Sequence, residues 1–315
     1  MMHEVIVVGA GLSGLGACYE LEKRGISYLL VEVKRQIGGS FATVQQDGFT
    51  IDRTTFALLN QFPDGWLASL GLADSLFEMR EGIHAFEGGM AQLIDALSAK
   101  LTGARMMRTA VSSIGDIEGK LWGVCLENGV LLTSNRVIVA APARYAARMF
   151  STSIPEITAQ LVDYHYDDML RVSLGYRADD ITRDMLHFYR EPAYVFHHRT
   201  EHSSRVPVGH VLLQIGVRLH PERTTPEKLV AYLTKEVKLP PVPATQLMTY
   251  WAEADPLSAY DDEHGQRLAT IASHLPATIA LIGSDYTTKQ SPRVGVVRLD
   301  ERIELAQAAV AKVIA

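Results

Sequence analysis

Hydrophobic positions near the start of the chain form first an unbroken run and then a helical repeat. Residues 5–8 are all apolar and end at Gly9, which is typical of a strand buried on both faces. Apolar residues then recur at helical spacing over 14–24, up to the helix-ending Gly25. Together with a second apolar run that finishes at Glu32, the pattern predicts a strand, a glycine turn, a helix and a second strand.

The rest of the chain alternates between strand-like and helix-like segments. Gly88 and Gly89 precede a predicted helix, and short strands with a turn at Asn128 and Gly129 are expected over 106–139. Further strands are predicted at 169–177, 194–199 and 211–218, followed by a helix that starts at Pro226. The tail returns to the first pattern, with a strand "TIALIG" and a helix expected to begin near Val296.

This order of elements predicts an α/β fold with a Rossmann-like domain and an interleaved, mixed α+β second domain. We assign 1–57, 84–148 and 266–315 to the first domain, and 58–83 and 149–265 to the second. A chain of 315 residues is slightly longer than one hydrophobic core usually supports, which favours two parts. The second domain is the candidate substrate domain.

Composition narrows the class of partner. The net charge is −6 and the 30 Lys and Arg residues are scattered, so we expect neither nucleic acid nor an anionic membrane surface as a partner. No apolar segment is typical of a signal peptide or an integral membrane span. The two cysteines, Cys18 and Cys125, are expected to be reduced thiols of a cytoplasmic protein that acts on a small molecule.

A metal site is not expected. His197, His198 and His202 lie close together in the sequence, but no Cys, Asp or Glu completes a recognisable set of ligands around them. We interpret them as structural side chains.

The first turn carries the pattern G-x-G-x-x-G at Gly9, Gly11 and Gly14, between the predicted strand and helix. Gly9 permits the tight turn, Gly11 allows the backbone to approach a pyrophosphate, and Gly14 allows close packing of helix and strand. The backbone at Leu12 and Ser13 opens the helix, whose N-terminus favours phosphate. Glu32 is placed to bind ribose hydroxyls, so the segment predicts dinucleotide binding.

A second glycine turn follows at Gly38 and Gly39, and "VEVKRQIGG" together with "GAGLSGL" resembles the flavin-containing amine oxidoreductase superfamily. That superfamily includes monoamine oxidases, protoporphyrinogen oxidases and phytoene desaturases. The similarity extends to "FEGGMAQLIDAL", "RTAVSSI", "RVIVAAP", "YWAEADPLSAYDDEHGQRLATI" and the C-terminal "LIGSDYTTKQSPRVGVV". The resemblance identifies a compact member with an FAD-binding domain of the glutathione reductase type.

The resemblance implies which residues bind the cofactor, FAD in place of a nicotinamide dinucleotide. The glycine pair would lie beside the pyrophosphate, and the C-terminal helix would direct its N–H groups at the flavin. No cysteine lies near that segment, so FAD is expected to be noncovalent. The implied cofactor-binding residues are Gly9, Gly11, Leu12, Ser13, Gly14, Glu32, Val33, Gly38, Gly39, Ser40, Val111, Gly283, Asp285 and Val296.

The chain departs from the family pattern at three places. Gln36 and Ser40 stand where the family commonly has arginines around the glycine pair. Arg53, Thr54 and Thr55 replace a glycine that the family places near the flavin ring. The sequence Gly283, Ser284, Asp285 shifts by one residue the acid that the family uses for the ribityl chain.

The implied activity is that of an FAD-dependent oxidoreductase, similar to amine oxidases and protoporphyrinogen oxidases, that takes a hydride from an organic substrate onto flavin N5. Catalytic residues are not identified by the sequence. Weak candidates are Trp251, Tyr286 and Arg53, with Arg171 and Tyr194 as further possible substrate contacts. Oligomeric state is not readable either.

Two other functions fit the same pattern. One is a flavin-dependent non-redox isomerase of the UDP-galactopyranose mutase type. The other is a non-catalytic binding protein that keeps the fold, as GDP-dissociation inhibitors do.

Overall fold

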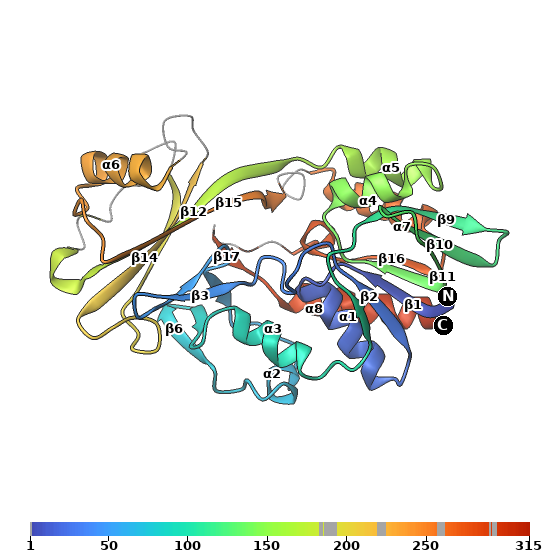
Figure 1. The fold of residues 1–315 in the computed structure, drawn as a ribbon, viewed down its shortest axis with the longest axis horizontal. Coiled ribbons are helices and arrows are strands. Elements are labelled where there is room, and N and C mark those ends of the chain that lie inside the picture. Colours follow the sequence, from blue (N-terminus) through green and yellow to red (C-terminus); the bar gives the residue numbers. More distant parts are fainter. Residues whose placement is uncertain are drawn as a thin grey trace.

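A computed structural model of the chain describes residues 2–182, 185, 194–218, 225–256, 262–289, 291 and 295–315. Within these ranges, the side chains of 167–168, 194–196, 218, 236–237 and 253–256 are not described. Two lobes are visible in Figure 1, a seven-stranded sheet between helices at one end and a four-stranded sheet with one helix at the other.

The seven-stranded sheet has a parallel centre and an antiparallel edge. β1 pairs in parallel with both β2 and β11, which places the first predicted strand in the middle of the sheet. β11 pairs with β10 along its first half and with β16 along its second half. In spatial order the strands are β8 (Ala104–Met106), β2 (Tyr28–Val31), β1 (Met2–Val8), β11 (Leu131–Val139), β10 (Leu121–Leu126) and β9 (Val111–Ile117), with β16 (Ile279–Leu281) beside β11.

Helices cover both faces of this sheet, which explains why β1 is apolar throughout. Val5 and Val7 pack into one core, and Ile6 and Val8 pack into another on the opposite face. The first face is covered by α1 (Leu12–Lys23), α3 (Ala91–Ser98) and α8 (Asp300–Ile314), and the second by α4 (Ala143–Phe150), α5 (Pro155–Val162) and α7 (His264–His274) (Figure 1).

The second lobe is an antiparallel sheet with β14 (His210–Arg218) between β13 (Tyr194–Thr200) and β12 (Tyr166–Arg177), and with β15 (Thr245–Pro256) on the far side of β12. One face packs on α6 (Pro226–Val237), whose start is capped by the Thr225 hydroxyl as it accepts a hydrogen bond from the Lys228 N–H. A short 3₁₀ turn, η1 (Ala178–Asp180), follows β12.

Two small sheets connect the lobes. One contains β3 (Thr43–Gln46) and β4 (Phe49–Asp52), and the other β17 (Val296–Val297), β5 (Ala57–Leu59), β7 (Ile83–Phe86) and β6 (Leu76–Arg80). The short helix α2 (Trp66–Ser69) and the turn η5 (Ser284–Tyr286) complete the described elements. Several side chains between 58 and 83 pack into the core shared by α1 and α3, and the proposed domain boundaries stay a prediction.

One element differs from its predicted position. The last helix does not begin near Val296 but at Asp300. Val296 lies in β17, where it pairs with Ala57 of β5 and packs against Ile83. Consecutive β-branched valines favour the extended strand, and the acids Asp300 and Glu301 in the first turn favour the observed helix start.

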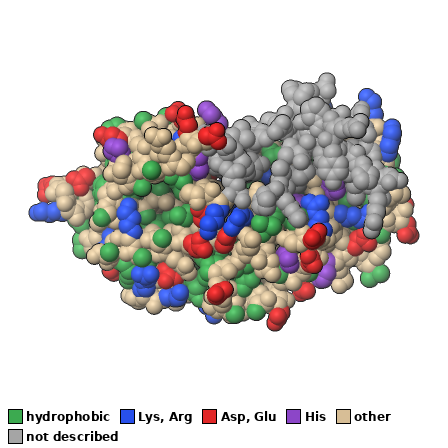
Figure 2. Space-filling model, turned by 180° about the vertical axis from the view of Figure 1, so that it is seen from behind, with side chains coloured by type: hydrophobic (Ala, Val, Ile, Leu, Met, Phe, Trp, Pro, Cys, Tyr) green, Lys and Arg blue, Asp and Glu red, His purple; other side chains and the backbone are tan. Residues whose placement is uncertain are grey.

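Surface charge is mixed. On the face shown in Figure 2, outside its grey part, Lys and Arg side chains are interspersed with acidic ones and hydrophobic side chains are scattered. None of the helices in the described part of the chain combines the length and apolar character that crossing a membrane requires.

Candidate functional site

Two of the three glycines of the first turn are required by packing. Gly9 has φ +100°, and a Cβ there would lie 2.5 Å from the carbonyl oxygen of Ala140. A Cβ on Gly14 would lie 1.9 Å from the Gly9 carbonyl oxygen, so α1 could not approach the turn with any larger residue. Both glycines hold the end of β1 tightly against α1 and β11.

Gly11 is different, because its missing side chain leaves open space. A Cβ there would have one neighbour within 4 Å, the Cα of Gly39 at 4.0 Å. The second glycine turn lies directly against the first: the Gly38 N–H donates a 2.7 Å hydrogen bond to the Ala10 carbonyl, and Gly11 and Gly38 form a parallel bridge. The two glycine turns predicted from the sequence thus form one backbone-lined surface.

A cavity of about 780 Å³ opens on this surface. It extends from the glycine turns past Glu32 and Val111 on one side, and to Thr249 and Trp251 of β15 on the other. Of the sequence-predicted residues, the cavity is lined by Gly9, Gly11, Leu12, Ser13, Glu32, Val33, Gly39, Ser40, Val111, Gly283 and Asp285, and by the catalytic candidates Arg53 and Trp251. Gly14, Gly38, Val296 and Tyr286 do not line it.

Glu32 is nearly buried and is held in position by the backbone. One carboxylate oxygen accepts a 2.6 Å hydrogen bond from the Ala10 N–H, and the other accepts a 2.7 Å bond from the Lys34 N–H. A carboxylate offers about four acceptor positions, so each oxygen retains one for another donor. Glu32 can therefore accept hydrogen bonds from two hydroxyl groups in the cavity.

Asp285 also lines the cavity, but its carboxylate forms hydrogen bonds with other groups of the protein. Its Oδ2 accepts a 2.8 Å hydrogen bond from the Ala143 N–H at the start of α4, and another from the Tyr166 hydroxyl. Burial and the negative charge of Asp285 raise the pKa of Tyr166 well above its usual range, which keeps the hydroxyl protonated as a donor. Asp285 thereby fixes η5 to the N-terminus of α4, where a negative charge is favourable.

The catalytic candidates occupy different environments. Trp251 lines the cavity and packs with Phe56 and Met169, and the guanidinium of Arg171 lies 5.2 Å from the centre of its ring. Arg171 is 3% exposed and does not line the cavity, so it lies behind Trp251. Arg53 is exposed at the cavity wall. The side chain of Tyr194 lies outside the described residues.

Tyr286 is buried away from the cavity, in the core that includes Tyr164. Burial, followed by the charge of Asp285, raises the pKa of the Tyr286 hydroxyl well above its usual range. This side chain is a core aromatic residue, and a contact with substrate is not supported by its position.

The three histidines of the sequence motif lie in different surroundings. The Nε2 of His198 lies 3.1 Å from the Gly295 carbonyl, and the ring of His202 stacks on Phe77 at 4.1 Å. His197 is half-buried on β13. Across the ranges that the structure describes, no three metal-ligating side chains converge on one point.

Sequence reasoning missed several residues of the cavity wall. Tyr145, Arg148 and Met149 come from α4, and Arg302 comes from the first turn of α8. These side chains reach the cavity through the packing of distant helices, and no local motif marks them. Gln36, in contrast, is exposed and does not line the cavity, whereas Ser40 does.

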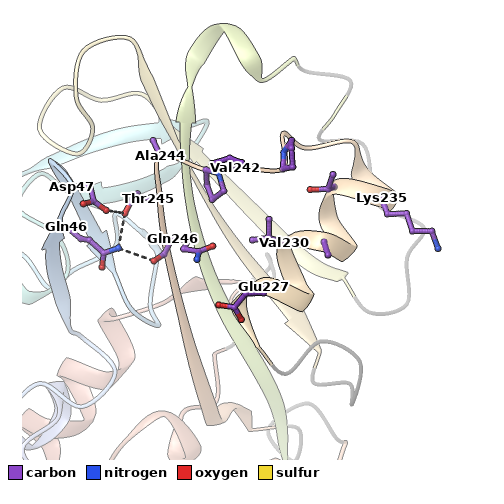
Figure 3. A pocket seen from close by; sticks show the side chains of 13 residues that line it. Gln46, Asp47, Glu227, Val230, Lys235, Val242, Ala244, Thr245 and Gln246 are labelled. Atoms are coloured by element: carbon purple, nitrogen blue, oxygen red, sulfur yellow. Dashed lines mark hydrogen bonds between the residues drawn. The ribbon is translucent and has the colours of Figure 1, made fainter.

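A second pocket of about 720 Å³ lies far from the glycine turns, between α6 and the start of β15 (Figure 3). Val230 of α6 and Val242 lie on opposite sides of it, and Gln46, Asp47, Thr245 and Gln246 are joined at its edge by hydrogen bonds. None of the sequence-predicted site residues lines this pocket.

Comparison with known proteins agrees with the site. The model of a NAD(P)-binding Rossmann-like domain matches residues 7–69, and the model of the flavin containing amine oxidoreductase family matches residues 65–292. The chain is similar to protoporphyrinogen oxidase 2 of Arabidopsis thaliana, 36% identical over 72 residues, and to 4,4'-diapolycopene oxygenase of Methylomonas sp, 46% identical over 50 residues. These segments make up 22% and 16% of this chain, but only 14% and 10% of the respective relatives.

Solved structures share the whole fold. An Exiguobacterium sp. 255-15 protein assigned as a protoporphyrinogen oxidase superposes with a TM-score of 0.76 at 13% identity, covering 98% of both chains. A putrescine oxidase variant superposes with a TM-score of 0.69 at 14% identity, covering 100% of this chain and 99% of that one. These likenesses confirm the predicted Rossmann-like fold class.

The second family match covers well over half of the 315 residues and includes the cavity-lining segments from Thr109 to Gly283. The chain therefore belongs to the flavin containing amine oxidoreductase family.

Proposed function

We propose that this protein is an FAD-dependent oxidoreductase that oxidises a small organic molecule. The observation that carries the proposal is the contact between Gly11 and Gly39, which places two side-chain-free turns at one end of a cavity of about 780 Å³. The other end of the same cavity reaches Thr249 and Trp251 of the antiparallel sheet. A cofactor bound on the glycines could therefore meet a substrate bound against β15.

The residues present fit an adenine dinucleotide. A Cβ on Gly11 would enter the cavity, so its absence leaves room for a phosphate beside the N–H groups of Leu12 and Ser13. Glu32 retains acceptor positions for two ribose hydroxyls, and Val111 offers apolar surface to a base. The family to which the chain belongs favours FAD as this dinucleotide.

FAD, when bound, would supply the electron acceptor, with a hydride passing from a substrate C–H bond to flavin N5. The protein would contribute binding and orientation. Trp251 packs against Phe56 and Met169, so it can serve as a wall for a substrate. Asp285 and Tyr166 fix the start of α4, the helix that carries Tyr145, Arg148 and Met149 of the cavity wall.

Binding of FAD is proposed to be noncovalent. In the described part of the chain no cysteine lines the cavity: Cys18 packs in the core of α1, and Cys125 lies on β10. Burial raises the pKa of the Cys18 thiol, which keeps it neutral and unreactive. We further propose a cytoplasmic location, in keeping with two unpaired cysteines, and a substrate domain made of 58–83 and 149–265.

The test is the chemistry of the purified protein. We expect a yellow protein whose FAD is released by acid or heat, and anaerobic bleaching of the flavin absorbance by substrates that include amines and porphyrinogens. Turnover of a nucleotide sugar only after the flavin has been reduced would instead establish the isomerase. Protein that is isolated without flavin and does not bind added FAD would contradict the proposed activity and favour the non-catalytic alternative.

A further inference from the structure

Glu127 differs from the other acids on the cavity wall. The carboxylate of Glu32 is held by two backbone N–H groups, and that of Asp285 is held by the start of α4. The carboxylate of Glu127 is exposed, and within the described ranges it has neither an ion-pair nor a hydrogen-bond partner. Because Glu127 lines the cavity, it adds an acceptor that the described part of the protein does not itself use.

Backbone hydrogen bonds connect Glu127 to the wall that starts at Glu32. The Thr109 N–H donates a 2.9 Å hydrogen bond to the Glu32 carbonyl. The Glu127 N–H donates another, also of 2.9 Å, to the carbonyl of Ala110, the neighbour of Val111. All five of these residues line the cavity, so its wall is continuous from the acid at the glycine turns, past Val111, to Glu127.

The turn that carries Glu127 is held by its own hydrogen bonds. The Leu126 carbonyl accepts a 2.9 Å bond from the Gly129 N–H, and the Asn128 side-chain oxygen accepts a 3.1 Å bond from the Val130 N–H. Leu126 is 2% exposed and packs in the core below the sheet. Glu127 therefore combines an anchored backbone with a side chain that, among the described residues, has no bond to break before it contacts a ligand.

We propose that Glu127 is a specificity residue for the adenine of the dinucleotide. A base is bonded directly to its ribose, so with the ribose hydroxyls at Glu32 the base occupies the adjoining part of the cavity, beside Val111. The exocyclic amino group of adenine donates hydrogen bonds, whereas hypoxanthine has an accepting oxygen at the same position. An ionised carboxylate only accepts, so Glu127 favours adenine and repels that oxygen. This inference rests on the proposed function, because it requires the cavity to hold a dinucleotide.

The experiment measures equilibrium binding of FAD, ADP and IDP, the hypoxanthine counterpart of ADP, to the flavin-free protein by calorimetry. The wild type should prefer ADP to IDP. In Glu127→Ala and Glu127→Gln the ratio of the two affinities should fall by at least about threefold, the effect of losing one hydrogen bond to an exposed charged group. Glu127→Gln should also bind IDP more tightly than the wild type does, because its amide N–H can donate to the hypoxanthine oxygen.

Glu118→Gln is the matched control. It makes the same change of charge in the turn between β9 and β10, where Glu118 is exposed and does not line the cavity. This variant should keep the wild-type preference for ADP. Since Glu118 and Glu127 are both exposed, neither substitution should disturb the fold.

The outcomes are separable. Equal affinities for ADP and IDP in the wild type, or an unchanged preference in Glu127→Ala, would overturn the role of Glu127 and leave the proposed function standing. A parallel change of both affinities in Glu127→Gln would also overturn it, because it would show an effect of charge on the phosphates that the two ligands share. A wild-type protein that binds neither FAD nor ADP would instead remove the proposed function, and this inference with it.

Discussion

The guanidinium of Arg205 lies 2.7 Å from the carboxylate of Asp52, and both side chains are 1% exposed or less. Two further N–H groups of Arg205 donate to backbone carbonyls, Nε to Thr50 at 3.0 Å and Nη1 to Phe86 at 2.9 Å. The other oxygen of Asp52 accepts a hydrogen bond from the Met90 N–H. This buried pair joins the segment after β13 to β4, β7 and the start of α3, and thus connects the two lobes.

Removing one partner of this pair should be strongly destabilising. Arg205→Met leaves the Asp52 carboxylate buried without its cation, and we expect a loss of about 3–5 kcal/mol in the free energy of unfolding. Urea denaturation of flavin-free protein measures it. Arg199→Met is the matched control, because Arg199 pairs with Glu201 at the surface and should cost no more than about 1 kcal/mol. Equal losses in the two variants would contradict the role of burial.

Substitution of two motif glycines should separate packing from cofactor binding. Gly14→Ala places a Cβ 1.9 Å from a backbone oxygen, and we expect it to lower the free energy of unfolding by about 1–3 kcal/mol or more. Gly11→Ala points into the cavity, so the flavin-free protein should keep its stability within about 0.5 kcal/mol. FAD affinity should fall at least about tenfold in Gly11→Ala. Unchanged FAD affinity in this variant would place the pyrophosphate elsewhere.

His198 should make stability depend on pH. Burial lowers its pKa from 6.5 to about 3, because the charged ring would lose its contact with water; the hydrogen bond to the Gly295 carbonyl opposes this effect without cancelling it. The unfolded chain therefore binds more protons than the folded one between pH 3 and 6.5. Stability should be fully present above pH 6.5 and should fall on acidification by up to about 1.4 kcal/mol per pH unit from this group.

The measurement for His198 is the free energy of unfolding between pH 4 and 7.5, compared with His198→Gln. The variant should show a shallower pH dependence over the acidic range. His274→Gln, at an exposed position on α7, should keep the wild-type slope. A slope that is the same in His198→Gln and the wild type would show that other groups carry the acid sensitivity.

Two tyrosines test the network at Asp285. Tyr166→Phe removes the hydroxyl that donates to the Asp285 carboxylate, and it should lower the free energy of unfolding by about 1.5–3 kcal/mol. Tyr176→Phe is the same change at a buried hydroxyl that has no hydrogen-bond partner among the described residues, and it should be nearly neutral. Thermal and urea denaturation of both variants provide the comparison. A larger loss for Tyr176→Phe would contradict the assigned network.

The sequence was most informative where a short local pattern is compatible with only one local structure. The turn at Gly9, Gly11 and Gly14 and the acid Glu32 follow from strand, turn and helix within one short segment. In the structure Gly9, Gly11 and Glu32 line one cavity, and Gly14 packs against Gly9. The apolar run of β1 predicted burial on both faces because each successive side chain needs an apolar partner. Such features depend only on neighbours along the chain.

Features that depend on packing between distant elements were not predictable. Arg302 reaches the cavity because α8 packs against Gly16 of α1. The Asp285 carboxylate accepts hydrogen bonds from Ala143 of α4 and from Tyr166, residues that are distant from it in the sequence. Val296 was expected at the helix start, and only its pairing with Ala57 shows that the chain is extended there. Tyr286 is an aromatic residue at a position that the sequence made a candidate for the active site, and only its burial in the structure assigns it to the core.

The most direct test of the central claim is which dinucleotide the flavin-free protein binds. Titration with FAD and with NADH under the same conditions, followed by absorbance and fluorescence, should show saturation by one FAD per chain and no competition from NADH. Preferential binding of NADH, with FAD unable to displace it, would contradict the account that the Gly11 and Gly39 turns form a flavin dinucleotide site.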